Sequence, residues 1–533
     1  MGYLLTMYQQ FYSSPEMGAN MWLTLFIGHW LGEPFGGTVV NYKLAASFIL
    51  ALTAVLAYLG LSIELGHRWS LAVSLFITFL FVSRSGEWVG YNNLTAFFYV
   101  FGGVTLFFGL RDERRLLVLL AGGILGANIF IRFPNILGFG LALTIVLHGV
   151  LHRWRASKNI HWFSIFLIGY AAGVVAVLLL MRAHGHEDYY IEGVKYIFEM
   201  AFDTRSHHAG SLLINIFIRD KFYALILSTI VFFFGIVILR LLIARPFHSQ
   251  IAGILAAAVI LAFAFHFTES WKWALTGIIY FGLIWIAWQQ RRDRPALVTL
   301  AFICLTILVI APLGSNNGIR NAIYGYWLAL PLCLAWLWQR SKCALPALPY
   351  LTDSGGGRLA ALTLGLSITG YGLFTAWTYA YRDSPNRFDL THKIDHPLLA
   401  GTHTTEARAK VVGELLTELN RYVRAGDSLL AFPSLGALHY LTATKPMLNN
   451  PWPNLDSAPR LEAKLAKART LGRLPVIVRS RGNTRSFGWP LDSAMKDSPF
   501  EESSMRILNE FVEHGSYRLK WRNSFFEILV PDS

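Results

Sequence analysis

An arginine between two apolar stretches is the residue of this sequence best suited to bind a phosphate. Arg132 lies in the stretch Gly126–Asn135, which also contains small residues, two asparagines and Pro134. A guanidinium can donate to two oxygens of one anion, and an ionisable residue at membrane depth is costly and usually functional. The sequence therefore predicts a phosphate contact at Arg132. The alternative is an arginine that only marks a helix end, with its charge at the lipid surface.

Carboxylates near predicted outward loops are candidates for a general base, which must accept a proton from the attacking group. Glu87 lies just before Asn92 and Asn93, whose amides would contact a sugar or an acceptor. Two further candidates, Glu16 and Glu33, are the only carboxylates of residues 1–40. Each has a structural alternative, since an asparagine can cap a helix and a glutamate often lies at a helix end.

A pair of histidines follows a later apolar stretch. His184 and His186 precede Glu187 and Asp188 in a long polar segment, and they are candidate sugar or acceptor contacts. These side chains are of types that bind divalent cations, but no second ligand pair stands at a supporting spacing. The sequence therefore predicts no metal site and leaves a divalent cation open as a cofactor. Clustered polar residues are also ordinary in a solvated loop.

A loop rich in glycine and asparagine offers one more candidate site. Asn316 and Asn317 would contact a sugar or acceptor, and Arg320 would contact a donor phosphate. Backbone N–H groups in such a loop can also bind an anion. A plain turn between two helices is the competing interpretation.

Long apolar segments must hold these residues in place. Of the 533 residues, 54% are hydrophobic and 15% are charged. In a typical soluble protein about a quarter of the residues are charged. A membrane-crossing helix needs about 20 mostly apolar residues, with some tolerance. The composition predicts a polytopic α-helical membrane protein with about twelve spans: 41–65, 69–83, 93–110, 116–131, 134–151, 163–181, 222–243, 251–267, 273–288, 296–312, 322–338 and 359–381.

The orientation of the spans follows from lysine and arginine, which accumulate in cytoplasmic loops. One set of loops carries clusters such as Arg111–Arg115 and Arg291–Arg294, whereas the opposite short loops carry isolated basic residues. The net charge of +14 is thus largely a matter of topology, and a nucleic-acid partner is not needed to explain it. Residues 1–40, 182–221 and 382–533 are predicted to face outward. The three cysteines show no metal-ligand spacing.

The outward N-terminal segment has no signal peptide, so another element must carry it across the membrane. A helix encoded before Met1 is the favoured explanation, and unaided insertion of 41–65 is the alternative. Residues 19–40 contain Trp22 and Trp30 among apolar residues, which is typical of an interfacial helix. A short core helix is the competing interpretation.

The composition changes near Tyr381, and residues 382–533 lack any apolar run long enough to cross a membrane. Alternating helical and strand patterns predict a soluble α/β domain. No phosphate-binding loop, nucleophile elbow or zinc spacing is present in it. The predicted elements are helices around 411–423, 461–471 and 500–513 and strands at 428–432, 474–478, 517–521 and 525–529.

This layout resembles that of the polyprenyl-phosphate-dependent glycosyltransferases of the GT-C fold, which include the protein O-mannosyltransferases and the aminoarabinose transferase of lipid A. That family has amphipathic helices in its first outward loop, a long outward loop after its seventh helix and often a soluble outward domain at the end. With one helix restored before Met1, residues 182–221 become the long loop. The stretch Gly2–Gln10 resembles the one that follows the family's first-loop acidic pair.

The resemblance implies inverting transfer of a sugar from a polyprenyl-phosphate donor to an outward-facing glycan, lipid or protein acceptor at the inner membrane, with the C-terminal domain in the periplasm. A carboxylate would act as the base, and a cation such as Arg132 would stabilise the leaving phosphate. Two departures matter: the acidic pair would fall before Gly2, and the second-loop acid aligns with Asn92 or Asn93, which leaves Glu87 as the favoured base. The alternatives are a transporter or flippase of lipid-linked sugars and a catalytically inactive GT-C-like scaffold.

Overall fold

The computed structural model describes most of the chain in separate ranges. Predicted spans 222–243 and 251–267 lie outside the described residues, as does most of 359–381. The described residues are 2–66, 69–82, 89–202, 270–313, 318–340, 386–470, 474–484, 488–490 and 499–532, with isolated positions between 369 and 384.

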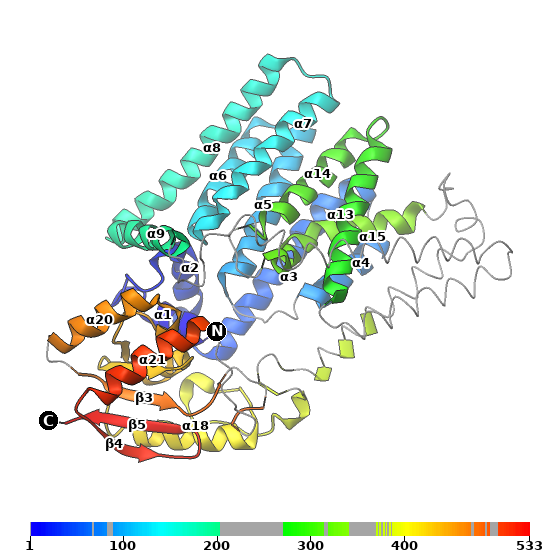
Figure 1. The fold of residues 1–533 in the computed structure, drawn as a ribbon. Coiled ribbons are helices and arrows are strands. Elements are labelled where there is room, and N and C mark those ends of the chain that lie inside the picture. Colours follow the sequence, from blue (N-terminus) through cyan, green and yellow to red (C-terminus); the bar gives the residue numbers. More distant parts are fainter. Residues whose placement is uncertain are drawn as a thin grey trace.

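Apolar helices form one bundle, with the strands gathered at one end of it (Figure 1). Among the described residues, four helices are long and apolar enough to cross a membrane: α3 (Val39–Leu65), α5 (Tyr91–Arg111), the continuous helix Phe133–Leu151 and α8 (Ala156–Ala183). The other apolar helices of the bundle are α4 (Trp69–Val82), α6 (Arg115–Ala127), α13 (Ser270–Gln290), α14 (Pro295–Ile310) and α15 (Tyr326–Arg340). All nine coincide with predicted spans, while the total of twelve stays a prediction.

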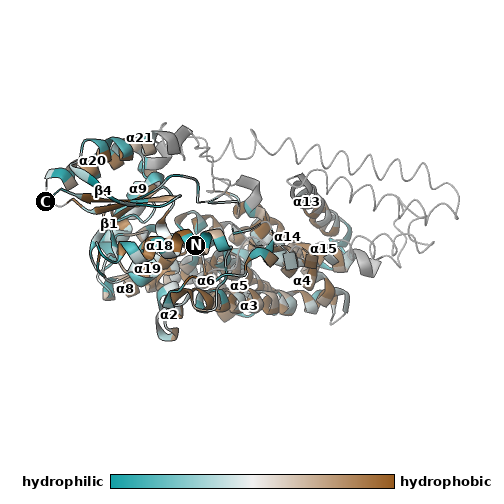
Figure 2. Ribbon diagram, turned by 90° about the horizontal axis from the view of Figure 1, so that it is seen from below, coloured by the Kyte–Doolittle hydropathy of each residue, from teal (hydrophilic) through white to brown (hydrophobic). Residues whose placement is uncertain are grey.

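Burial differs between helices at the edge of the bundle and helices inside it. In α8 the most apolar window has a mean hydropathy of 2.5, yet only 22% of it is buried. Ile168, Val175 and Leu179 are each more than half exposed on this helix. Such an apolar exposed face is stable only against lipid or another protein surface. Helix α5, by contrast, is 78% buried in its apolar window and lies within the bundle. The apolar character of the bundle is visible in Figure 2.

Small residues allow α6 and α8 to cross closely. A Cβ atom added at Gly122 or Gly126 would overlap a backbone carbonyl oxygen of α8, and one at Gly169 or Gly173 would overlap a carbonyl oxygen of α6. Helices in membranes use such small residues to bring their backbones together. The crossing holds the end of α6, and the chain that follows it contains Arg132.

The predicted break between spans 116–131 and 134–151 is confirmed. Helix α6 ends at Ala127 and passes into a short 3-10 helix, η4 (Asn128–Phe130). A second 3-10 helix, η5 (Phe133–Ala142), leads into α7 (Leu143–Leu151). Arg132 has an extended backbone, with φ −160° and ψ 140°, between the two 3-10 helices.

The strands form one mixed five-stranded sheet of order β2-β1-β3-β5-β4. Strands β2, β1 and β3 are parallel, and β5 and β4 are antiparallel to their neighbours. Separate apolar clusters involve α18 and α21. The strands are β1 (Ser428–Phe432), β2 (Lys445–Pro446), β3 (Val476–Ser480), β4 (Tyr517–Arg522) and β5 (Phe526–Pro531), and the helices are α18 (Glu406–Leu419), α19 (Gly436–Thr442), α20 (Ala458–Thr470) and α21 (Pro499–Glu513).

The sequence patterns located these elements well. The strand predicted at 428–432 coincides with β1, and the helices predicted at 461–471 and 500–513 differ from α20 and α21 by a few residues at their ends. The two-residue strand β2 was not predicted, because so short a segment has no period. We call this part, residues 406–532, the sheet region.

Three helices lie between the bundle and the sheet region: α1 (Gly2–Gln9), α2 (Trp22–Gly32) and α9 (Glu187–Phe202) (Figure 1). The Thr6 hydroxyl donates to the Gly436 carbonyl at 2.8 Å, and the Gln10 amide donates to the Thr444 carbonyl at 2.6 Å. The first residues of the chain therefore pack on α19, more than 400 positions away in the sequence.

Helix α2 lies within the segment predicted to form an interfacial helix. Trp22 is 1% exposed, whereas Trp30 is 52% exposed. The indole N–H of Trp22 donates to His186 at 3.1 Å, so the segment after α8 covers this end of α2. Trp22 is therefore covered by protein, whereas Trp30 is exposed, and the interfacial position of this helix stays a prediction.

Candidate functional site

The guanidinium of Arg132 is directed into the protein. Its side chain is 7% exposed overall, its Nε donates to the Asn135 oxygen at 2.9 Å, and an Nη donates to the Ala311 carbonyl at 3.0 Å. Ala311 caps the C-terminus of α14, where the helix dipole presents roughly half a negative charge. Arg132 is thus not a helix-end marker that reaches the lipid surface.

Asn135 connects Arg132 to two other parts of the bundle. Its amide nitrogen donates to the Thr95 hydroxyl at 2.8 Å, to the Asn128 side-chain oxygen at 2.9 Å and to the Asn128 carbonyl at 3.1 Å. Asn135, Asn128 and Thr95 are all fully buried. Helix α2 adds a further contact, because the Thr24 hydroxyl donates to the Ile131 carbonyl at 2.8 Å. The result is a segment held at both ends, which we call the Arg132 segment (residues 128–135).

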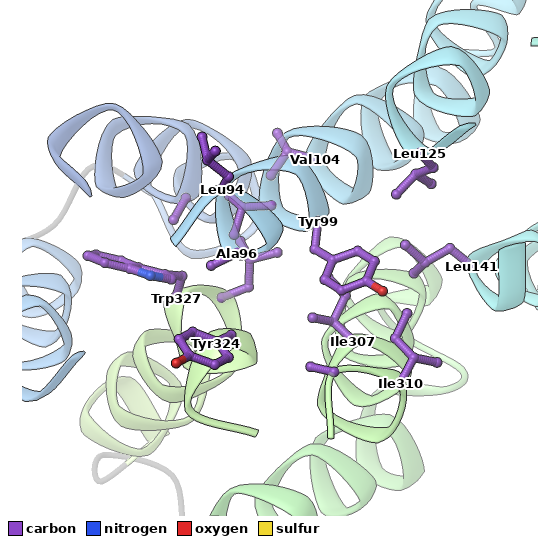
Figure 3. Close-up of a cluster of buried hydrophobic side chains, with 14 of the residues drawn as sticks. Leu94, Ala96, Tyr99, Val104, Leu125, Leu141, Ile307, Ile310, Tyr324 and Trp327 are labelled. Carbon is purple, nitrogen blue, oxygen red and sulfur yellow. The ribbon is translucent and has the colours of Figure 1, made fainter. Parts of the chain in front are cut away.

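Two buried donors near Arg132 have no acceptor among the described residues. They are the side-chain amide nitrogen of Asn128 and the hydroxyl of Tyr99. Figure 3 shows the Tyr99 ring directed from α5 toward Leu141 and Ile310, which offer it no polar atom. The Tyr99 ring packs against η5, because a Cβ atom added at Gly138 would come within 3.1 Å of it. Buried donors without acceptors are rare in proteins and call for an explanation.

The charge of Arg132 is not balanced by a carboxylate within the described part of the chain, where it forms no ion pair. Its bonded partners there are an amide oxygen and a carbonyl oxygen. A buried cation with neutral partners is costly, because its desolvation is only partly compensated. An anionic ligand would supply the missing charge and the acceptors that Asn128 and Tyr99 lack.

The predicted bases are not brought to this site by the described structure. Glu16 is exposed and forms no ion pair among the residues described here. Glu33 begins the 3-10 helix η2 (Glu33–Phe35), and Glu87 lies outside the described residues. The identity of the base therefore stays a prediction.

Asn92 and Asn93 do not cap their helix. Helix α5 begins at Tyr91, and Gly90 occupies the cap position without a side-chain hydrogen bond. Both asparagines therefore lie in the first helical turn, where Asn93 is 5% exposed. The side-chain oxygen of Asn92 is buried and has no hydrogen-bond partner in the described part of the chain. The helix-cap alternative is wrong, because the helix begins before the asparagines.

The two predicted histidines lie in a cluster of aromatic rings and not in a solvated loop. His184 caps the C-terminus of α8, and His186 is 4% exposed against Trp22 and Phe11. Burial and the neighbouring His184 lower the pKa of His186, so its ring is neutral and accepts the Trp22 N–H. His29 from α2 also joins this cluster, through a stacked contact with Phe11.

No group of three metal-ligating side chains is found among the described residues. The absence of a metal site stays a prediction. Helix α9 occupies part of the predicted outward loop 182–221. The backbone of Arg320 lies in the 3-10 helix η6 (Gly318–Gly325), while Asn316 and Asn317 lie outside the described residues.

Sequence patterns missed the residues that hold Arg132. Thr95, Asn135 and Ala311 come from three different helices, and Ala311 lies 179 positions after Arg132. Only the buried polar residue Asn135, three positions after Arg132, left a local signal. Thr95 resembles any helix threonine, and the Ala311 carbonyl leaves no trace in the sequence.

No family model matches the chain, and no curated protein matches it. The structure is similar to the crystal structure of ArnT from Cupriavidus metallidurans in the apo state, with a TM-score of 0.49 and 11% sequence identity. The similarity covers 99% of this chain and 92% of that one. At this distance the match carries no argument about residues or activity.

Proposed function

We propose that this chain is a membrane glycosyltransferase that moves a sugar from a polyprenyl-phosphate donor to an outward-facing glycan, lipid or protein. The observation that carries the proposal is the buried guanidinium of Arg132, which is bonded to neutral groups, in a part of the bundle where the donors of Asn128 and Tyr99 have no acceptor among the described residues. All three offer N–H or O–H groups, which suits a phosphate. Their place in a lipid-facing helical bundle suits a phosphate carried by a lipid.

In the proposed reaction an acceptor hydroxyl attacks the anomeric carbon, and the bond from that carbon to the phosphate oxygen breaks. The hydroxyl proton passes to a carboxylate, and the lipid phosphate leaves with the electron pair of the broken bond. Arg132 would stabilise the negative charge that develops on the leaving phosphate. Attack from the face opposite the phosphate inverts the anomeric centre.

Transfer is tested with purified protein, a polyprenyl-phosphate sugar labelled in the sugar, and envelope glycan or lipid as the acceptor. Labelled acceptor that depends on Arg132 supports the proposal. Movement of intact donor across proteoliposome membranes without any transfer would support the transporter alternative instead. Donor that is neither bound nor moved would favour the inactive scaffold.

The base is tested by three isosteric variants, Glu87→Gln, Glu16→Gln and Glu33→Gln. We propose Glu87, because the second outward loop leads directly into α5, which carries Thr95 and Tyr99. Loss of a general base lowers turnover by roughly 10²–10⁴-fold with little change in donor affinity. Full activity of all three variants would place the base elsewhere.

Orientation is tested with reporters. We propose that the sheet region is periplasmic and that loops such as Arg291–Arg294 are cytoplasmic, following the distribution of basic residues. A reporter fused after Ser533 is expected outside, and one inserted at Arg292 inside. A cytoplasmic C-terminus would reverse every outward assignment at once.

A further inference from the structure

Helix α9 contacts the Arg132 segment on one side. The rings of Phe130 and Tyr190 are 5.1 Å apart between centroids, and those of Phe133 and Phe198 are 5.5 Å apart. Phe130 and Tyr190 are both buried. The two aromatic pairs flank Arg132 in the sequence, so any shift of α9 changes the packing on both sides of this residue.

The same helix contacts the sheet region through Tyr196. The Tyr196 hydroxyl donates to the Asp456 carboxylate at 3.3 Å, and the Arg460 guanidinium lies 3.7 Å from the centre of the Tyr196 ring. Hydrogen bonds to charged groups and cation–π contacts are among the stronger polar interactions in proteins. Tyr196 is therefore held by an anion at its hydroxyl and a cation at its face.

Asp456 is firmly placed within the sheet region. Its side chain is 4% exposed, and Lys464 of α20 binds it at 2.8 Å. The Ser504 hydroxyl of α21 donates to its backbone carbonyl at 3.3 Å. Burial and the Asp456 carboxylate raise the pKa of Tyr196 well above its ordinary value, so the hydroxyl stays protonated and remains a donor.

We propose that Tyr196 is a positioning residue that couples the sheet region, through α9, to the geometry of the Arg132 segment. The sheet region thereby holds the phosphate-binding arginine in its binding position, although it lies outside the bundle. This inference rests on the proposed function for its role in donor binding. The mechanical coupling itself can be measured without any donor.

The coupling is tested by hydrogen–deuterium exchange of the full chain in detergent. Tyr196→Ala removes the hydrogen bond to Asp456 and the ring contact with Arg460. We therefore expect about tenfold or faster exchange in residues 187–202 and at least a severalfold increase in residues 128–135. Tyr196→Phe keeps the ring under Arg460 and removes only the hydroxyl, so its effect should be smaller in both segments. Ile191→Ala is the matched control, because Ile191 is 50% exposed on the same helix.

Faster exchange in 187–202 with unchanged exchange in 128–135 would overturn the coupling, and unchanged exchange in both would overturn the contact itself. Tyr196→Phe keeps the test open if Tyr196→Ala does not fold. Binding of polyprenyl phosphate in micelles is then compared, and we expect a several-fold weaker affinity in Tyr196→Phe. A wild-type protein that binds no polyprenyl phosphate would contradict the proposed function, while the exchange result still decides the coupling.

Discussion

Glu527 and Arg132 are both buried, but the groups around them differ in charge. In the sheet region, Glu527 has a side chain 3% exposed and accepts from Arg479 and Arg522 at 2.6 Å each, with Arg481 at 3.9 Å. In the bundle, Arg132 is bonded to an amide oxygen and a carbonyl oxygen. The carboxylate has more opposite charge around it than it needs, and the guanidinium has only neutral partners among the described residues.

The difference separates a structural charge from a binding charge. Strand pairing brings Arg479 and Arg522 beside Glu527 from both neighbouring strands, so the network stabilises the sheet. Burial alone would raise the pKa of Glu527, but the hydrogen bonds and charges of the two arginines outweigh it and lower the pKa below its ordinary value. Arg132 gains no such compensation from the described residues, so its desolvation is a cost that a bound anion would offset.

The largest expected effect comes from Arg132→Met. Removing a charged hydrogen-bond donor should weaken polyprenyl-phosphate binding about tenfold to hundredfold. The free energy of unfolding should stay the same or rise, because the variant no longer buries a charge with neutral partners. Donor titration and chemical denaturation of the same preparations check both results. Unchanged binding would mean that Arg132 has a structural role like that of Glu527.

Glu527→Gln should show the reverse pattern. We expect the free energy of unfolding to fall by about 1–3 kcal/mol, reduced from the value for a fully buried pair because the arginines are partly exposed. Because the folded pKa is lowered, the stabilisation is complete above the ordinary carboxylate pKa of 4.5 and is lost as the pH falls through the folded value. Denaturation at pH 7 and at acidic pH measures it, and unchanged donor binding is the control.

Asn135→Asp would place an opposite charge beside Arg132, as the arginines already do beside Glu527. A carboxylate 2.9 Å from the Arg132 Nε would compensate the guanidinium, so donor phosphate should bind about tenfold more weakly. Asn135→Gln is the neutral comparison, although its extra methylene also disturbs packing. Equal donor affinity in Asn135→Asp and wild type would argue that charge balance at Arg132 does not govern binding.

The smallest expected effect concerns His439, a third buried ionisable group, whose ring is neutral in the folded protein at pH 7. It is 1% exposed in α19, and burial lowers its pKa from 6.5 to about 3. Its neutral ring contributes stability that is complete above about pH 6.5 and is lost as the pH falls toward 3. From pH 7 to pH 6 the loss is roughly 0.7 kcal/mol. His439→Gln should remove this part of the slope in pH-dependent denaturation; an identical slope would contradict the assignment.

The sequence by itself determined the features that depend on neighbouring positions. Apolar length predicts spans such as 41–65 and 163–181, because a bilayer demands a minimum run of apolar residues. Alternation and helical period located β1, α20 and α21, since each element shows one face to a core. Arg132 also stood out locally, as a charge between two apolar stretches.

Only the tertiary structure decided which groups meet. Thr95, Asn135 and Ala311 surround Arg132 because three helices pack there, and backbone carbonyls and helix crossings leave no periodic signal in the sequence. The contact of Tyr196 with Asp456 joins residues 260 positions apart. Trp22 suited a membrane surface by residue type, yet the segment after α8 covers it. Local patterns record which face of an element is apolar, whereas its partner depends on the packing of the whole chain.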